Sequence, residues 1–205
     1  MKKKKITYSW MGWIIVLLLV FLLKETQNYQ EEIANEIIRF HVLANSDSAK
    51  DQKLKLQVKK EVVAYMQQAL AGANNKREAE KIINDNIEEI RSIAKKTIKA
   101  AGYHYDAVAY LGNKEFPIKA YGEFVFPAGE YETLQVEIGQ AKGKNWWCVM
   151  FPSLCIIDES YTVVPEEAKE TLEDNLGTPA YKSLTEDTTV KYDWKIKDIW
   201  NDLWD

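Results

Sequence analysis

The chain contains 205 residues, of which 46% are hydrophobic, 12% aromatic and 28% charged, and its formal net charge is −4. This content of apolar and aromatic side chains is higher than that of disordered chains, so a folded domain is expected. Residues 1–24 hold five lysines and no acidic residue, which leaves 22 basic and 31 acidic residues, a charge of −9, for the rest. A domain this acidic lacks the basic face that nucleic-acid binding requires, so no nucleic-acid partner is expected.

The N-terminal segment predicts export across the cytoplasmic membrane. Lysines at residues 2–5 precede eighteen uncharged residues, 6–23, a length between the apolar region of a signal peptide and a membrane-spanning helix. The lysines indicate the cytoplasmic side, so the chain beyond Lys24 is expected outside the cytoplasmic membrane. No A-x-A cleavage pattern follows the apolar run, so of a signal peptide and an uncleaved membrane anchor we favour the anchor.

The next part of the chain predicts one strand and two long helices. Residues 25–36 form a polar, weakly helical connector, and the alternation of apolar residues over 37–44 predicts a first strand. Apolar residues then recur at helical spacing over about residues 48–71 and again over about 76–101, and each run is followed by glycine. The short connection between the two runs favours an antiparallel helical hairpin.

Beyond Gly102 the pattern changes to the alternation that is typical of strands. Further strands are predicted at residues 103–111, 123–126, 132–138, 146–151 and 154–157. Gly112-Asn113 is predicted to be a turn, and the glycine- and proline-containing connections favour an antiparallel meander. A short helix over about residues 165–176, a polar linker and an amphipathic helix over about 191–204 follow.

These elements indicate an α+β fold, with an antiparallel sheet packed against a long helical hairpin and with an N-terminal membrane-targeting helix. We expect a single extracytoplasmic domain over residues 37–176. It is preceded by the targeting segment, 1–24, and the connector, 25–36, and it is followed by a linker and C-terminal amphipathic helix, 177–205.

The two cysteines allow two interpretations. If residues 151–152 form a two-residue turn, Cys148 faces Cys155 at a separation that a disulfide accepts, and export would allow the bond to persist. We favour this cross-strand disulfide over free thiols. A catalytic thiol would need a nearby base, but His41 and His104, the two histidines of the chain, each lie in a strand-like pattern that favours a structural role. No catalytic residue is therefore predicted.

A polar run between the first strand and the first long helix contains Asn45, Ser46, Asp47 and, slightly later, Asp51. Its carboxylates resemble part of a calcium loop, but the glycine and the final carboxylate of that motif are missing, so no metal ion or other cofactor is predicted. Two interpretations remain: the run caps the helix, or it also forms a recognition surface.

Trp146 and Trp147 are adjacent in a predicted strand, so their side chains should point to opposite faces of the sheet. One of them can pack in the core. The other is either an interface residue or is covered by another part of the chain, such as the C-terminal helix.

Two blocks of the sequence resemble a known family. IRFHVLANSDSAKDQKLKLQVKKEVV, residues 38–63, and YGEFVFPAGEYETLQVEIGQAKGKNWWCVMFPSLC, residues 121–155, are similar to the signature blocks of the stage II sporulation protein R family of endospore-forming bacteria. The lysine-rich, apolar leader is similar too, and the resemblance covers roughly residues 36–158. Ser153 stands where the family usually has a second proline, and Lys60-Glu61 replaces an Arg-Asp pair.

The resemblance implies an exported signalling protein, without established enzymatic activity, that acts in the space between the forespore and mother-cell membranes. There it would switch on a membrane-embedded aspartic protease of the mother cell, which removes the pro-sequence of the early mother-cell sigma factor. The expected partners are thus this protease, through its extracytoplasmic part, and the membrane, through the N-terminal segment. Two alternatives are a secreted hydrolase that uses Cys148 with His41 or His104, and a structural, wall-associated domain.

For the activator, we expect a partner-binding surface built from the polar run, the first strand and the later aromatic residues, with one of the two adjacent tryptophans exposed. The candidate residues are His41, Asn45, Ser46, Asp47, Asp51, Tyr121, Trp146 and Trp147.

Overall fold

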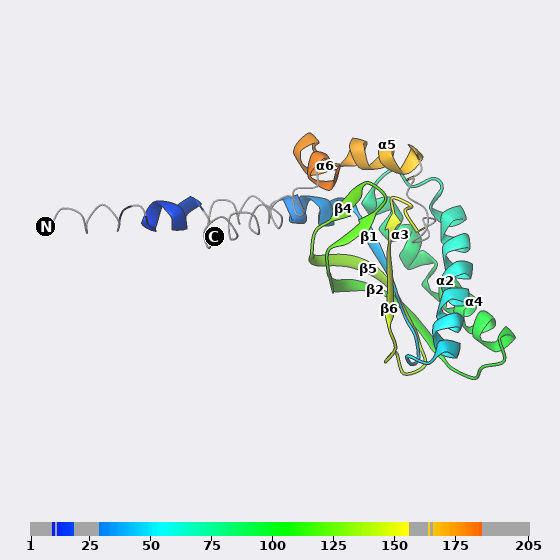
Figure 1. Ribbon diagram of the computed structural model, residues 1–205. Helices are drawn as coiled ribbons and strands as arrows, with labels where there is room; N and C mark the ends of the chain where they lie inside the picture. The colour runs from blue at the N-terminus through cyan, green and yellow to red at the C-terminus, as the bar shows by residue number, and fades with distance from the viewer. Residues whose placement is uncertain (1–9, 11, 19–28, 156–163, 165, 186–205) are drawn as a thin grey trace, which may run out of the picture.

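The computed structural model describes residues 10, 12–18, 29–155, 164 and 166–185. Residues 12–18 and 29–36 are helical, and eleven further elements follow in these residues. They are β1 (Ile38–Leu43), α2 (Ala49–Leu70), α3 (Lys76–Asp85), α4 (Ile87–Ala100), β2 (Ala107–Phe116), β3 (Lys119–Tyr121), β4 (Phe124–Phe126), β5 (Gly129–Ile138), β6 (Asn145–Phe151), α5 (Glu166–Asn175) and α6 (Thr178–Thr185). Helices and strands together confirm the α+β class (Figure 1).

The main sheet has the order β2-β5-β1-β6 and is mixed. β1 is parallel to β5 and antiparallel to β6, while β2 and β5 are antiparallel. The predicted antiparallel meander is therefore wrong. The physical reason is that β1 is joined to the later strands through α2–α4, and this long connection lets β1 enter the sheet between β5 and β6.

A layer of three helices, α2, α3 and α4, packs against one face of this sheet (Figure 1). The apolar residues of β1 that alternate inward, Ile38, Phe40 and Val42, are fully buried against it. α2 matches the first predicted helix, and its N-cap is Ser48, whose side chain accepts a hydrogen bond from the Asp51 backbone N–H. Burial of the apolar side of the helices thus explains their position.

The predicted long helical hairpin is not confirmed, because the second predicted helix is interrupted at Asn86. The Asn86 backbone leaves the helical region at φ −108° and ψ 5°. Its side-chain amide donates to the Ile82 carbonyl at 2.7 Å and its oxygen accepts from the Tyr65 hydroxyl. An asparagine that bonds to the local backbone competes with helical hydrogen bonding, which accounts for the break.

The predicted turn at Gly112-Asn113 is wrong, because β2 continues through it to Phe116. β2 pairs with β5 without interruption from Ala107↔Ile138 to Phe116↔Gly129. Ten consecutive cross-strand pairs outweigh a two-residue turn pattern. The chain turns instead after β2 and forms the small β3–β4 sheet.

A second apolar cluster lies on the opposite face of the main sheet, at one end. The helical residues 29–36, the β3–β4 sheet, α5 and α6 all contribute to it. The helix now seen as α5 was predicted from the sequence, whereas residues 25–36 were expected to form a polar, weakly helical connector and those of α6 a linker. This cluster covers only part of that sheet face.

Several predictions concern segments that are described in part or not at all. Leu154 and Cys155 do not form a strand, and residues 156–157 lie outside the described residues, as does the predicted C-terminal helix over 191–204. In the part of the chain that the structure describes, no helix is long and apolar enough to cross a membrane. Most of the predicted membrane-targeting helix also lies outside that part, so it stays a prediction.

Candidate partner-binding face

The sheet face opposite α2–α4 contains a row of polar and aromatic residues at its uncovered end. In neighbouring strands, residues that pair directly lie on the same face. The pairs His41↔Gln135, His41↔Trp147, Tyr110↔Gln135 and Val108↔Glu137 therefore place one set of side chains together. We name as the open sheet face the residues His41, Val108, Tyr110, Gln135, Glu137, Asn145 and Trp147.

Burial divides this face into a floor and a rim. His41 and Gln135, on the two central strands, are each 2% exposed and form the floor. Val108 and Tyr110, on the edge strand β2, are 42% and 40% exposed. Large apolar and aromatic side chains at such exposure are a reason to consider a binding surface.

His41 is held between an amide and an aromatic ring. Its Nε2 lies 2.9 Å from Asn145 Oδ1, and its ring stacks on Trp147 at a centroid distance of 5.9 Å. Its other ring nitrogen, Nδ1, is buried and forms no hydrogen bond among the described residues. Burial lowers the pKa of His41, and nearby Lys114 lowers it further, against the hydrogen bond to Asn145 Oδ1 and the charge of Glu137. A neutral His41 is thus favoured in the folded domain.

The two adjacent tryptophans separate as expected. Trp147 lies on the His41 face, and the Lys119 ammonium is 4.8 Å from its ring centroid. Trp146 lies on the other face, edge-on to Phe40 and beneath the Lys59 ammonium at 4.3 Å. Both are partly buried, so only Trp147 contributes to the open sheet face.

Tyr110 connects the edge strand to β5. Its hydroxyl donates to Glu137 Oε1 at 2.8 Å and lies 3.2 Å from Gln135 Oε1. Desolvation and this carboxylate raise the pKa of Tyr110 to about 12, so the phenol stays protonated and keeps its role as a donor.

Arg39, two residues before His41 on the same face, is fully buried without an acidic partner among the described residues. Its guanidinium lies over aromatic rings instead, 4.3 Å from the Phe116 centroid and 5.0 Å from that of Tyr131. Its Nη2 donates to the Tyr121 hydroxyl at 3.3 Å, and burial lowers the pKa of Arg39. Cation–π attraction offsets part of the desolvation cost of such a charge.

Tyr121 carries this contact on to Trp147. Its hydroxyl accepts from Arg39 and donates to the Trp147 carbonyl at 3.1 Å. Tyr121 and Trp147, both predicted as partner-binding residues, are therefore neighbours, with Tyr121 supporting the backbone of β6. Arg39 was not predicted from the sequence. The signal was an arginine near the start of a strand, between two residues that alternate into the core.

The polar run after β1 forms a compact hydrogen-bonded network around Asp51. This carboxylate is 4% exposed and accepts from the Asn45 amide at 2.8 Å and the Ser46 hydroxyl at 2.5 Å. Desolvation would raise the pKa of Asp51, but hydrogen bonds from Ser46, Asn45, Tyr105 and Ser48 together lower it. The network therefore favours the ionised carboxylate.

The same run is joined to the β5–β6 turn. Asp47 Oδ1 accepts from the Lys144 backbone N–H at 2.7 Å, and Asn45 Oδ1 accepts from that of Gln140 at 3.0 Å. Gly139 has φ +59°, and a Cβ there would clash with Asn45 Oδ1. The polar run thus caps α2 through Ser48 and positions the turn. Of the predicted partner-binding residues, the structure brings only His41, Tyr121 and Trp147 together on the sheet face opposite α2–α4.

Comparison with known proteins identifies the family. Residues 34–161, more than half of the chain, match the family model described as stage II sporulation protein R. The chain belongs to the stage II sporulation protein R family. Stage II sporulation protein R of Bacillus subtilis (strain 168) is 34% identical over 168 residues, which cover 82% of this chain and 74% of the relative. No solved structure matches.

The region that matches the stage II sporulation protein R family includes the open sheet face and the polar run. It also includes Cys148 and Cys155, which the structure places at disulfide distance with Cα atoms 5.2 Å apart. Cys148 pairs with Phe40 and so lies on the helix-covered face, whereas His41 lies on the other. This arrangement disfavours a Cys148–His41 dyad, and the described residues hold no cluster of side chains suited to a metal ion.

Proposed function

We propose that this chain is an exported sporulation signalling protein that activates a membrane-embedded aspartic protease of the mother cell. The family membership supports a role in sporulation. The protease would in turn process the pro-form of the early mother-cell sigma factor, and the chain would act without enzymatic activity of its own.

The observation that carries the binding part of the proposal is the open sheet face. Val108 and Tyr110 are well exposed on the edge strand β2, and the partly buried Trp147 lies across the same face on the opposite edge strand, β6. The four-stranded sheet holds all three, with β5 and β1 between them. Exposed aromatic residues on a rigid support commonly dominate the energy of protein interfaces. We assign direct contact to these three residues and a positioning role to His41, Tyr121 and the network around Asp51.

Activation requires that the chain bind the active state of the protease more tightly than the inactive state, because a ligand shifts an equilibrium only through differential affinity. The side chains of this face stand on strands that pair directly with their neighbours. Such a face should keep its shape when it binds a partner. Such a face suits the selection of one conformation of a partner, for example an assembled dimer of the protease.

The test is a reconstituted processing assay with the full chain, the protease and the pro-form of the sigma factor. The double variant Val108→Ala and Tyr110→Ala should lower processing by about tenfold or more. Truncation of an interface hot spot to alanine typically removes about 2 kcal/mol or more of binding free energy. Its melting temperature should fall by only a few degrees, because substitutions of surface residues usually change stability little.

Leu56→Ala is the matched control, because Leu56 is 50% exposed but lies on α2, on the far side of the sheet. This variant should process normally. Normal processing by the double variant, or an equal loss in the control, would assign activation to another surface.

A further inference from the structure

The overall acidity of the chain conceals a basic helical layer. Residues 49–100, which contain α2, α3 and α4, hold 12 lysine and arginine residues against 7 acidic residues, a charge of +5. Residues 101–205 hold 9 against 19, a charge of −10. Charge of opposite sign on separate parts of a domain indicates that the domain has a preferred orientation toward a charged partner.

The outward side of α2 and α4 carries the excess charge. Lys50, Lys53 and Lys60 are exposed on α2, and Lys96 and Lys99 are exposed on α4. α2 packs against α4, and a shallow groove of about 440 Å³ separates their outer sides, lined by residues of both helices that include Gln57, Lys96 and Ala100. We name these five lysines the basic helical face.

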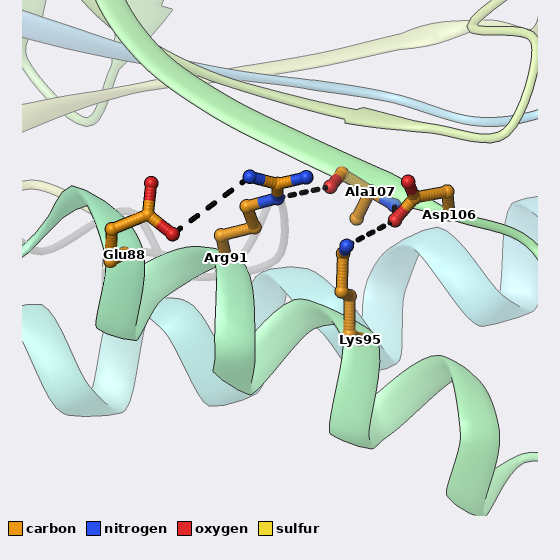
Figure 2. A network of polar contacts seen from close by, with 5 residues as sticks. All are labelled: Glu88, Arg91, Lys95, Asp106 and Ala107. Carbon is orange, nitrogen blue, oxygen red and sulfur yellow. Dashed lines mark hydrogen bonds and ion pairs between the residues drawn. The ribbon is translucent and has the colours of Figure 1, made fainter.

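Other cations of α4 are already paired at its sheet-facing side, as Figure 2 shows. Arg91 lies 3.8 Å from Glu88 and donates through Nε to the Ala107 carbonyl at 3.3 Å, while Lys95 lies 2.6 Å from Asp106. These contacts join α4 to the start of β2. Arg91 and Lys95 therefore have a structural role and do not belong to the basic helical face.

Few acidic residues lie among the exposed lysines. Lys96 has a contact of 3.7 Å with Glu89, but both side chains are well exposed, and such pairs contribute little in water. Glu61 lines the groove beside Lys96. Five exposed lysines against these two carboxylates leave a face with a net charge of about +3.

We propose that the basic helical face docks on an anionic phospholipid surface. Lysines that are spread over two neighbouring helices, without a deep pocket, fit a diffuse layer of negative headgroups better than one discrete acidic ligand. The proposal rests on the export that the proposed function includes and on the membrane attachment that the N-terminal segment predicts. It deepens that function, because docking through α2 and α4 would direct the open sheet face, on the other side of the sheet, away from the lipid.

The test measures how fast each lysine is modified by an amine-reactive reagent in the full chain bound to vesicles. One vesicle type contains phosphatidylcholine alone and the other an equimolar mixture with phosphatidylglycerol, so the N-terminal segment can attach to both. Modification of Lys53, Lys60, Lys96 and Lys99 should slow by about fivefold in the anionic vesicles, which corresponds to roughly 1 kcal/mol per lysine. The difference should disappear at high salt.

Lys114 and Lys182 are the internal controls, because both are exposed but lie on β2 and α6. Their modification rates should be the same in both vesicles. Equal rates for all lysines in both vesicles would overturn the proposal, and so would protection that requires an added acidic protein.

A matched pair of triple variants gives a second readout. Lys53→Glu, Lys60→Glu and Lys96→Glu should abolish the slowing at Lys99, whereas Lys114→Glu, Lys142→Glu and Lys182→Glu, with the same change in net charge, should preserve it. Melting curves establish that both variants are folded. Because no protease is present, the result does not depend on whether the chain activates one.

Discussion

Arg39 and His41 show how a strand can carry polar residues at the centre of a sheet. Both are almost fully buried, yet neither forms a salt bridge with an acidic side chain among the described residues. Aromatic rings take that place: Phe116 lies against the Arg39 guanidinium and edge-on to the His41 ring. Two buried polar groups therefore depend on the same ring, which connects the covered end of this sheet face to its open end.

The buried state of His41 predicts a pH dependence of stability. Its folded-state pKa is lowered below the ordinary 6.5, so the unfolded chain binds a proton first as the pH falls. The stability that neutral His41 provides is therefore complete above about pH 6.5 and decreases as the pH falls through and below that value. Urea unfolding should show this slope, and His41→Gln should reduce it.

His104→Gln is the control for this measurement, because His104 is exposed and the variant keeps His41. It should retain the slope of the unmodified chain. An unchanged slope in His41→Gln would mean that another group binds the proton.

Asp51 predicts a second pH dependence, in a lower pH range. Here the ionised form of the side chain stabilises the fold, whereas for His41 it is the neutral form. The folded-state pKa of Asp51 lies below the ordinary 3.8, so the ionised form stabilises the fold above that value, and this contribution is lost as the pH falls through the folded pKa. Asp51→Asn should cost about 2 kcal/mol at neutral pH, since hydrogen bonds to a charged group are lost. Urea unfolding from about pH 7 to about pH 2.5 should show the free energies of unfolding of the unmodified chain and of Asp51→Asn converging in the acidic range. A difference between them that stays constant with pH would contradict this account.

At the scale of the elements, the polar run after β1 acts as a joint between three of them. It caps α2 through Ser48, and it holds the β5–β6 turn through Asn45 and Asp47. The sequence predicted the cap and left a recognition role open. The long-range contacts could not be predicted, because they depend on the parallel pairing of β1 with β5, which brings residues about 95 positions apart together.

The same limit explains which parts of the sheet face were predictable. Alternation within β1 and β6 indicated that Trp146 and Trp147 point to opposite sides, as the structure has them. It could not indicate how far each side is covered. Coverage is decided by the helical residues 29–36 and by α6, whose sequences are polar enough to resemble connectors.

The contact between Cys148 and Cys155 leads to a prediction for the end of β6. Cys148→Ser should lower the free energy of unfolding by about 2 kcal/mol, since a bond that closes a short loop restricts the unfolded chain only modestly. Adding a reductant to the unmodified chain should shift the urea midpoint in the same direction, and should leave the midpoint of the variant unchanged. If the reductant has no effect on the unmodified chain, the two thiols are free.

At the scale of the whole molecule, the sheet separates two faces of different chemistry. The open sheet face presents aromatic and apolar residues at the edge strand, and the outer side of α2 and α4 presents lysines. A chain that acts between a lipid surface and a protein needs two such faces on opposite sides. This arrangement gives a reason for the strongly uneven distribution of charge along an acidic sequence.

The proposed activity requires the domain to be outside the cytoplasmic membrane, and this topology can be tested directly. Lysines at residues 2–5 before an uncharged run should keep the N-terminus in the cytoplasm, so in intact, non-sporulating cells that express the chain an added protease should degrade the domain. A cytoplasmic protein serves as the control for cell integrity. Replacing the four lysines with glutamate should weaken this orientation and increase the protected fraction, because basic residues set the direction of insertion. Full protection of the unmodified domain in intact cells would place it in the cytoplasm, where it could not reach the extracytoplasmic part of a membrane protease.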